Sequence, residues 1–447
     1  MDTTLVANPS MTLEDLASQA LELAKRQGAS AAEVHASIGS GLSVTVRRGE
    51  VETVEHHRDK GLTVTVFFGR RSGSASTSDF RGAALAEAVS AACVIARYTA
   101  EDPFNGLADP EHLARTIPDL DLYHPWALGV DEAITQARRC EEAAFAHDPR
   151  VRNSEGATVT THEGTDLYAT STGFLGAVRA SRQGVSCAVI GEDGEGGMQR
   201  DYDYATACDA RDLPDVESVG ETAASRAVRR LGARQIKTCQ VPVVYEAPVA
   251  RSLLSHLVSA VSGPSLYRRS SFLVDSLGQA LFPKWVHLYE DPLRKKGNGS
   301  APFDGEGVET RYRDLVTEGV LRRYCLDSYA GRKLGLVTTA NAGGVHNLMI
   351  EPGADDLAGL LRRMGRGLLV TELIGFGING VTGDYSRGAA GFWVEDGAIA
   401  YPVQEITVAS NLRDMYRGLL AVGNDIDFRH RIATGSLLVE RMTVAGH

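Results

Sequence analysis

Apolar side chains in the first 100 residues follow first a helical and then a strand-like spacing. Thr12 is followed three positions later by Asp15, which is a capping-box pattern, and apolar residues then recur at helical spacing as far as Gly28. The period next changes to two, which predicts strands over residues 32–37, 42–48, 51–56 and 62–68, with turns at 48–50 and 59–61. An Ala-rich run predicts a second helix over 83–98.

The next part of the chain reads as a connection followed by a meander between two helices. Four X-Pro pairs between residues 99 and 126 predict a long irregular segment. Helical spacing returns over 130–147 and again over 216–231. Between the two helices, alternating runs predict antiparallel strands over 157–161, 166–172, 176–183, 185–190 and 198–207, and Glu163-Gly164 reads as a hairpin turn.

The remaining half opens with a predicted strand over 241–246 and a helix over 248–261, after which strand-like runs dominate. The expected fold class is therefore α+β, with an N-terminal α/β region of antiparallel sheet and helices and a C-terminal mostly-β domain. Pro-rich and Gly-rich connections divide the chain into a flexible N-terminus (1–11), an N-terminal α+β domain (12–125), a central antiparallel α+β segment (126–235) and the C-terminal domain (236–447).

Composition narrows the partners and the compartment. The 46 Lys and Arg against 57 Asp and Glu give a net charge of −11, which disfavours binding to nucleic acid or to anionic membranes. No apolar run reaches the 18 or so residues of a membrane helix, and the first ten residues lack the features of a secretory signal. The six cysteines form no CxxC pair and are typical of buried residues in a reducing compartment, so we expect a cytoplasmic protein.

Two short motifs match known sites only in part. Gly375, Gly377 and Gly380 fit the dinucleotide pattern G-x-G-x-x-G after a strand-like run, but residues 381–388 read as a loop and not as the helix that such a site needs. His162-Glu163 begins like a zincin motif, but Asp166 stands where the second His belongs. Neither motif therefore supports a nucleotide or a zinc site.

The predicted helix 248–261 carries a single histidine among apolar residues. His256 has only Arg251 and Ser252 as neighbours on the same helix that could take part in chemistry, and a guanidinium is no metal ligand. A lone His on an apolar face is more typical of a hydrogen-bonded core residue. No G-x-S-x-G elbow and no P-loop occurs, so the residues by themselves assemble no active site.

The C-terminal half nevertheless contains long runs of an unusual kind. They are SLYRRSSFL (265–273), DSLG (275–278), TEL-G-G-NGVTGDYSRGA (371–389), GFWVE (391–395), YPV (401–403) and GND (423–425). These runs resemble the TldD/PmbA family, and specifically its PmbA (TldE) branch. The resemblance spans roughly residues 10–447, although the N-terminal pattern is less diagnostic.

The resemblance implies a cytoplasmic heterodimer that acts as a zinc metalloprotease on unfolded or disordered peptides, such as leader peptides of modified natural products and antitoxins. The TldD-like subunit carries an HExxxH motif and a Cys ligand. Here Arg251 and Ser252 stand where the first His and the Glu would be, only His256 remains, and residues 431–435 contain no Cys. One His cannot hold zinc. We therefore expect no catalytic and no metal-binding residue in this chain, and zinc in the TldD-like HExxxH partner.

The expected contribution of this chain is a wall of the substrate chamber. Peptides bound in extended form are read through their backbone, which glycines allow to approach closely. The candidate substrate-binding residues are Gly375, Gly377, Asn379, Gly380, Asp384, Tyr385 and Arg387. The same segment could instead be a structural turn or part of the subunit interface. Two other functions remain open, a homodimeric peptide-binding or chaperone-like protein without proteolytic activity and an independent enzyme with a repurposed site.

Overall fold

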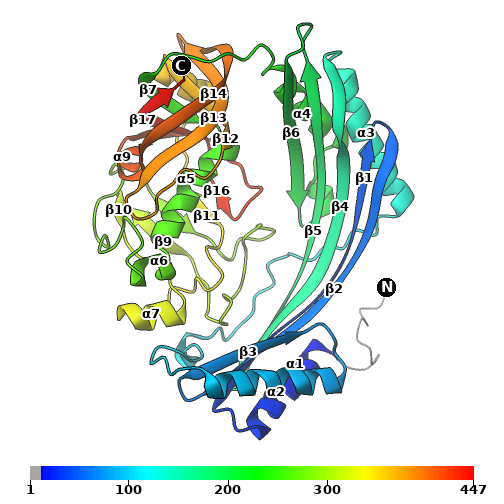
Figure 1. The fold of residues 1–447 in the computed structure, drawn as a ribbon, viewed down its shortest axis with the longest axis vertical. Helices are drawn as coiled ribbons and strands as arrows, with labels where there is room; N and C mark the ends of the chain where they lie inside the picture. Colours follow the sequence, from blue (N-terminus) through cyan, green and yellow to red (C-terminus); the bar gives the residue numbers. More distant parts are fainter. Residues whose placement is uncertain (1–11, 447) are drawn as a thin grey trace.

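Two sheet-based halves stand side by side in the computed structural model, which describes residues 12–446 (Figure 1). The predicted flexible segment 1–11 lies outside the described residues. The first half is a long antiparallel sheet with helices at its two ends, and the second is built mainly from two further sheets. The predicted α+β class, with an antiparallel N-terminal sheet and a C-terminal domain built on strands, is confirmed.

A single six-stranded sheet runs through the first half. Its strands, in spatial order, are β3 (Arg71–Thr77), β2 (Glu50–Phe68), β1 (Ala31–Arg47), β4 (Val151–Thr170), β5 (Leu175–Glu192) and β6 (Met198–Ala207). Strand β1 pairs with both β2 and β4. The two segments predicted to meet near residue 125 therefore share one continuous sheet.

The strands of this sheet are longer than the sequence pattern predicted, and two predicted turns are wrong. Asp59-Lys60-Gly61 lies inside β2 and Glu163-Gly164 lies inside β4. Both segments pair with the middle of β1, where Gly39 is opposite Asp59 on one side and Gly164 on the other. Pairing with β1 therefore holds β2 and β4 extended through residues that would otherwise favour a turn.

Four helices pack at the two ends of this sheet (Figure 1). They are α1 (Leu13–Arg26), α2 (Gly82–Tyr98), α3 (Val130–His147) and α4 (Val216–Val228). The predicted capping box is present, because the Thr12 hydroxyl accepts from Asp15 N at 3.2 Å and Thr12 N donates to the Asp15 carboxylate at 3.0 Å. Helices α3 and α4 approach closely because Gly220 faces Cys140, whose carbonyl oxygen would lie 2.0 Å from a Cβ at that position.

The long connection after α2 is irregular, as predicted, and holds only the short 3₁₀ helix η1 (Pro110–His112). It lies against helix α7 (Ser328–Leu334) of the second half. Arg332 of α7 donates to the carbonyl oxygens of Phe104, Gly106 and Leu107 at 2.5–3.3 Å. The Tyr329 hydroxyl donates to Asp102 at 2.8 Å. These contacts fasten the connection to the second half.

The larger sheet of the second half closes on itself. Its strands are β14 (Ala398–Asn411), β13 (Asp384–Glu395), β12 (Gly367–Ile374), β7 (Cys239–Tyr245), β17 (Leu437–Ala445) and β15 (Leu419–Val422), and a further pairing of β14 with β17 completes a ring. Helices α5 (Ala247–Ala260), α8 (Leu357–Met364) and α9 (Leu412–Arg417) pack against it. The largest hydrophobic core lies here, with Tyr245, Leu254, Leu257 and Tyr385 fully buried.

A smaller sheet extends this half. Its strands are β10 (Val320–Leu321), β9 (Arg313–Thr317), β8 (Leu288–Glu290), β11 (Leu348–Ile350) and β16 (Ile432–Ala433). The short helix α6 (Gly263–Tyr267) lies beside α7, and the 3₁₀ helix η2 (Ala210–Asp212) follows β6. No helix within residues 12–446 is long and apolar enough to cross a membrane.

A β-bulge displaces part of β12 from its partner β13. The register shifts between Val370 and Glu372, so Thr371 is the extra residue. Gly391 pairs with Val370, and a Cβ at Gly391 would lie 1.9 Å from the Leu369 carbonyl oxygen. The absence of a side chain at Gly391 therefore allows the two strands to approach at the bulge.

Replacing Gly391 by Ala should lower the free energy of unfolding by about 1–3 kcal/mol, the usual cost of forcing extra atoms into a packed site. Chemical denaturation with fluorescence detection measures this. Gly194→Ala is the control, because a Cβ there meets nothing within 4 Å and the backbone is not in the left-handed region. Equal stability of the two variants would show that β12 accommodates the methyl group without cost.

Candidate functional site

A cavity of about 330 Å³ lies beside helix α5. The helix begins directly after β7 with Pro248 in its first turn, a position where the missing N–H costs nothing. One side of α5 is buried in the core through Ala250, Leu253, Leu254 and Leu257. The other side lines the cavity with two pairs of residues one helical turn apart, which are Arg251 with Ser255 and Ser252 with His256.

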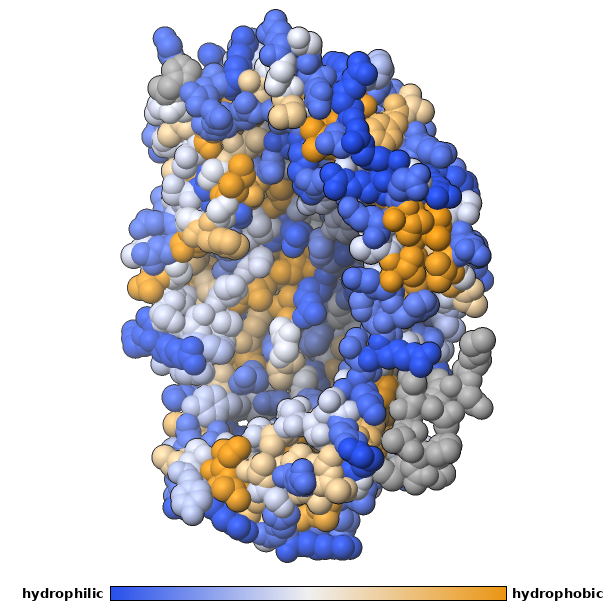
Figure 2. Space-filling model, turned by 45° about the vertical axis from the view of Figure 1, so that its right-hand side comes forward, coloured by the Kyte–Doolittle hydropathy of each residue, from blue (hydrophilic) through white to orange (hydrophobic). Residues whose placement is uncertain are grey.

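Both halves of the molecule contribute the remaining walls. Strand β6, helix α4 and the turn after it in the first half, and strands β12 and β13 of the second half, contribute Arg200, Asp201, Tyr202, Arg226, Arg230, Thr371, Glu372, Leu373 and Arg387. In the space-filling view the surface is hollowed between the two halves (Figure 2). The bulge in β12 falls at Thr371 and Glu372 and so shapes one wall.

Three of the five arginines around the cavity have acidic partners. Arg230, which follows α4, donates to Asp201 on β6 at 3.2 Å and to Glu372 on β12 at 2.5 Å. Arg226 lies 3.4 Å from the Asp201 carboxylate. Arg200 pairs with Glu155 at 2.8 Å. The positive charges of these three side chains are therefore balanced locally.

The other two arginines are not balanced. Within residues 12–446, Arg251 and Arg387 make no side-chain hydrogen bond and no ion pair, and the Nε atom of each is buried. His256 Nε2 is also buried without a partner. Burial, together with the nearby Arg387 charge, lowers the pKa of His256 to about 4. His256 is therefore neutral at pH 7, and two unpaired guanidinium groups dominate the charge of the cavity.

The donor set on α5 does not fit a zinc ion. Arg251 carries a permanent positive charge and offers no lone pair, and Ser252 offers only a neutral hydroxyl. Near β16, the family resemblance leads one to expect a Cys ligand. The buried Thr434 hydroxyl in this region donates to the Gly435 carbonyl oxygen at 2.8 Å. Among the described residues, no three His, Cys, Asp or Glu side chains are grouped so that they could hold a metal.

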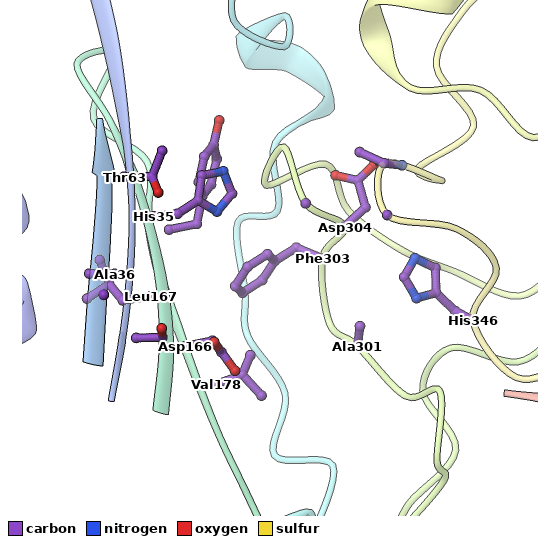
Figure 3. Close-up of a pocket in the computed structure, with 16 residues that line it drawn as sticks. His35, Ala36, Thr63, Asp166, Leu167, Val178, Ala301, Phe303, Asp304 and His346 are labelled. Atoms are coloured by element: carbon purple, nitrogen blue, oxygen red, sulfur yellow. The ribbon is translucent and has the colours of Figure 1, made fainter. Parts of the chain in front are cut away.

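A second and larger cavity, of about 450 Å³, lies farther along the long sheet (Figure 3). Strands β1, β2, β4 and β5 form one wall, and the loops 301–305 and 342–346 form the other. Phe303 projects between the walls, and its ring lies 5.3 Å from that of Phe174. On the sheet side, the rings of His35 and Tyr168 lie 4.5 Å apart. Burial lowers the pKa of both His35 and His346. The side chains here are mostly apolar or neutral, in contrast to the cavity at α5.

The glycine-rich segment after β12 folds back on itself. We call residues 375–383 the 375–383 loop. The side-chain oxygen of Asn379 accepts a hydrogen bond from Val381 N at 2.9 Å, and the Asp384 carboxylate accepts one from the Thr382 hydroxyl at 2.6 Å. Strand β13 begins at Asp384, so the loop predicted over 381–388 ends earlier than expected, and no helix follows the glycines. At the tip, Phe376 is 100% exposed.

The seven predicted substrate-binding residues do not gather in one place. Of the seven, Arg387 alone lines the cavity at α5. Tyr385 is 1% exposed and packs in the core beside His256, with ring centroids 6.0 Å apart. The close backbone approach at Gly377 is made by Ser386 of the same hairpin, because a Cβ there would lie 1.6 Å from the Ser386 carbonyl oxygen. The other four, Gly375, Asn379, Gly380 and Asp384, belong to the loop and its junction with β13.

Sequence reasoning missed several residues around the cavity, namely Arg200, Asp201, Arg226, Arg230 and Glu372. No motif signals them, because they come from three elements that are far apart in the chain. Arg251 and His256 were noticed in the sequence, but only as failed metal ligands. Their shared cavity with Arg387 follows from the fold alone.

Family comparisons cover most of the chain. Residues 238–446 match the PmbA/TldA metallopeptidase C-terminal domain, residues 123–231 its central domain and residues 32–96 its domain 1. The chain is 47% identical over 434 residues to "Metalloprotease PmbA" of Escherichia coli O157:H7, covering 97% of this chain and 96% of that one. It is 44% identical to "Metalloprotease PmbA homolog" of Haemophilus influenzae, covering 100% of this chain and 98% of that one.

Solved structures share the fold. A Bacteroides thetaiotaomicron protein, described as a candidate modulator of DNA gyrase, superimposes with a TM-score of 0.92 at 29% identity, covering 98% of this chain and 100% of that one. TldE from Thermococcus kodakarensis superimposes with a TM-score of 0.85 at 20% identity, covering 96% of this chain and 100% of that one. At that identity the second match bears on the fold alone.

Two carboxyl groups, that of Asp304 in the wall of the larger cavity and that of the half-buried Glu306 nearby in the chain, should make stability depend on pH. Burial raises the pKa of Asp304 to about 6 and that of Glu306 to about 7. Each group binds its proton more tightly in the folded than in the unfolded chain, where carboxyl groups titrate near pH 4. Their contribution to stability is therefore full below about pH 4 and is lost as the pH rises to about 7.

Glu306→Gln should reduce the loss of stability between pH 5 and pH 8 by about 1–3 kcal/mol, since one pKa unit corresponds to about 1.4 kcal/mol. Urea unfolding at the two pH values measures the change. Glu309→Gln, at an exposed position in the same segment, is the control and should keep the parental pH dependence. A parental pH dependence in Glu306→Gln as well would contradict the raised pKa.

Proposed function

The chain belongs to the PmbA/TldA metallopeptidase family, and from that membership we propose that it is the non-catalytic subunit of a heterodimeric TldD/TldE-type zinc metalloprotease. A cytoplasmic TldD-like subunit with an HExxxH motif would be its partner and would carry the zinc ion. The substrates proposed are unfolded or disordered peptides, such as leader peptides of modified natural products and antitoxin-like proteins.

The chemistry on α5 carries this proposal. Where the family resemblance expects a zinc-binding His and the Glu that activates water, the cavity is lined by Arg251 and Ser252. A guanidinium at that position repels a cation, and a serine cannot act as the carboxylate base. Of the expected set only His256 is present. The bond-breaking chemistry therefore belongs to the partner in this proposal, while this chain provides binding surface.

The two cavities suit a peptide that has no folded structure. The cavity at α5 is charged and the one in Figure 3 is mostly apolar, and both are bounded by the long sheet on one side and the second half on the other. A disordered peptide that spans such a cleft can place a polar and an apolar group at separate positions. This mode of binding does not require the peptide to present a folded surface with side chains in fixed positions.

We assign the 375–383 loop to contact with the partner subunit or with the peptide. Its tip and flanks expose three large apolar side chains, Ile374, Phe376 and Val381, within eight residues of chain. Exposed apolar groups that cluster in this way mark interaction surfaces more often than isolated ones do. The rest of the loop is held by its own hydrogen bonds, so it would present these side chains without needing to be ordered on binding.

The purified chain alone should not hydrolyse a disordered peptide, whereas a mixture with a TldD-like HExxxH subunit should. Chelation of zinc should abolish the activity of the mixture, because the metal belongs to the partner. Cleavage is followed by mass spectrometry with the partner alone as a further control. Chelator-sensitive hydrolysis by this chain alone would contradict the assignment. Peptide binding with no hydrolysis in any mixture would favour the homodimeric peptide-binding alternative.

Phe376→Ser should weaken association with the TldD-like subunit about tenfold, which corresponds to about 1.4 kcal/mol of lost apolar contact. Analytical ultracentrifugation or calorimetry measures the dissociation constant. Tyr98→Ser is the matched control, because Tyr98 is 89% exposed on α2 and lies far from the loop in the chain. If association is unchanged but peptide turnover falls, the loop contacts the peptide; if neither changes, the loop has no binding role.

A further inference from the structure

We propose that the cavity at α5 is a carboxylate-binding pocket, in which Arg251 and Arg387 bind one carboxylate group of a peptide and His256 adds a neutral hydrogen-bonding partner. The inference that the carboxylate belongs to a peptide rests on the proposed function. The pocket itself rests on the charges and contacts of the described residues, and it concerns this chain without its partner.

The charges around the cavity do not cancel. Arg200, Arg226 and Arg230 each have a carboxylate partner at 2.5–3.4 Å. Asp201 and Glu372 are among these partners and are therefore already paired. Those are the two acidic residues that line the cavity. Nothing with a negative charge is therefore left for Arg251 and Arg387. A buried or half-buried charge without a partner is costly, and native structures rarely keep one without a reason.

Among residues 12–446, five buried unsatisfied atoms belong to residues that line this cavity, and Arg226 Nε and Thr371 Oγ1 are two of them. The other three come from two elements. Arg251 Nε and His256 Nε2 are on α5, and Arg387 Nε is on β13. All three are buried and have no hydrogen-bond partner in the described structure. His256 and Arg387 line the same cavity, and besides burial the charge of Arg387 lowers the pKa of His256. That residues with unmet polar groups line one cavity indicates a missing ligand and not separate defects.

A carboxylate fits these groups better than other ligands. A guanidinium presents a planar fork of N–H donors that matches the two oxygens of a carboxylate, and two such forks can share one anion. Cations are repelled by the same pair. A neutral His256 can either donate or accept one hydrogen bond, whereas a charged one would add a third positive charge. On a peptide, the group is either the C-terminal carboxylate or the side chain of Asp or Glu.

The test measures binding of a fluorescent, disordered 12-residue peptide to the purified full chain by fluorescence anisotropy. The peptide is built from Gly, Ser, Ala and Leu with one internal Glu and a free C-terminus. Three further forms carry a C-terminal amide, Gln in place of Glu, or both changes. We expect the doubly neutral form to bind at least tenfold more weakly. The singly changed form that loses affinity identifies which of the two carboxylates is bound.

The protein variants are Arg251→Gln, Arg387→Gln and their combination, with Arg363→Gln on the exposed side of α8 as control. The double variant should bind all four peptides equally and as weakly as the parent binds the doubly neutral one. Arg363→Gln should behave as the parent does. Arg251→Lys should recover part of the affinity, because it keeps the charge but not the fork.

Thermal unfolding separates binding from damage to the fold. Without peptide, the double variant should melt at the same temperature as the parent or higher, because it removes two uncompensated charges. A clear fall in melting temperature would mean that the arginines are structural and would overturn the proposal. So would equal binding of the doubly neutral and charged peptides, or no binding of any peptide up to millimolar concentration.

These outcomes are independent of the protease assignment. If carboxylate-dependent binding is found but no mixture with a TldD-like subunit cleaves peptides, the pocket stands and the proposed function fails. If mixtures cleave peptides but the charged and neutral forms bind this chain equally, the protease assignment stands and the pocket fails.

Discussion

Arg230, two residues after the end of α4, is the side chain on which the arrangement of the two halves most depends. One end of its guanidinium donates to Asp201 on β6 at 3.2 Å and the other to Glu372 on β12 at 2.5 Å. It therefore bridges the long sheet and the ring of strands across a half-buried interface, where truncating one partner leaves buried charges behind. Farther along the same interface, Arg429 donates to Asp203 at 3.1 Å and Lys296 donates to Asp209 at 2.9 Å. A row of ion pairs thus fixes the distance between the walls of the cavity at α5.

The same interface explains how two neighbouring arginines can stay without partners. Every carboxylate that lines the cavity is already held by Arg226 of α4 or by Arg230 just after it, and α4 is itself fixed by close packing against α3 through Gly220. Asp201 and Glu372 cannot turn toward Arg251 or Arg387 without releasing Arg230. The rigid pairing on one side of the cavity therefore preserves the unpaired charge on the other side. Such preorganisation lowers the cost of ordering a bound anion.

The helices were predictable from sequence because their signals are local. The capping box at Thr12, the Gly-ended run after it and the periodicity over 130–147 place α1 and α3 almost at their observed bounds. The lengths of the strands could not be predicted in the same way. Asp59-Lys60-Gly61 and Glu163-Gly164 are residue types that favour turns, but they lie within strands. Whether such residues turn is decided by pairing with β1, which is distant in sequence. The candidate site was hidden for the same reason, because its walls come from β6, α4, α5, β12 and β13.

The β-bulge in β12 links the strand pairing to the charges around the cavity. The bulge at Thr371 moves Glu372 relative to the regular ladder, and Gly391 makes the bulge possible by allowing the Leu369 carbonyl to approach. Glu372 then meets Arg230, and four residues before Gly391 the same strand β13 carries Arg387 to the cavity wall. Without the extra residue, the part of β12 beyond the bulge would shift by one residue, and its side chains would exchange faces. The pairing of Glu372 with Arg230 therefore depends on a single extra residue in β12.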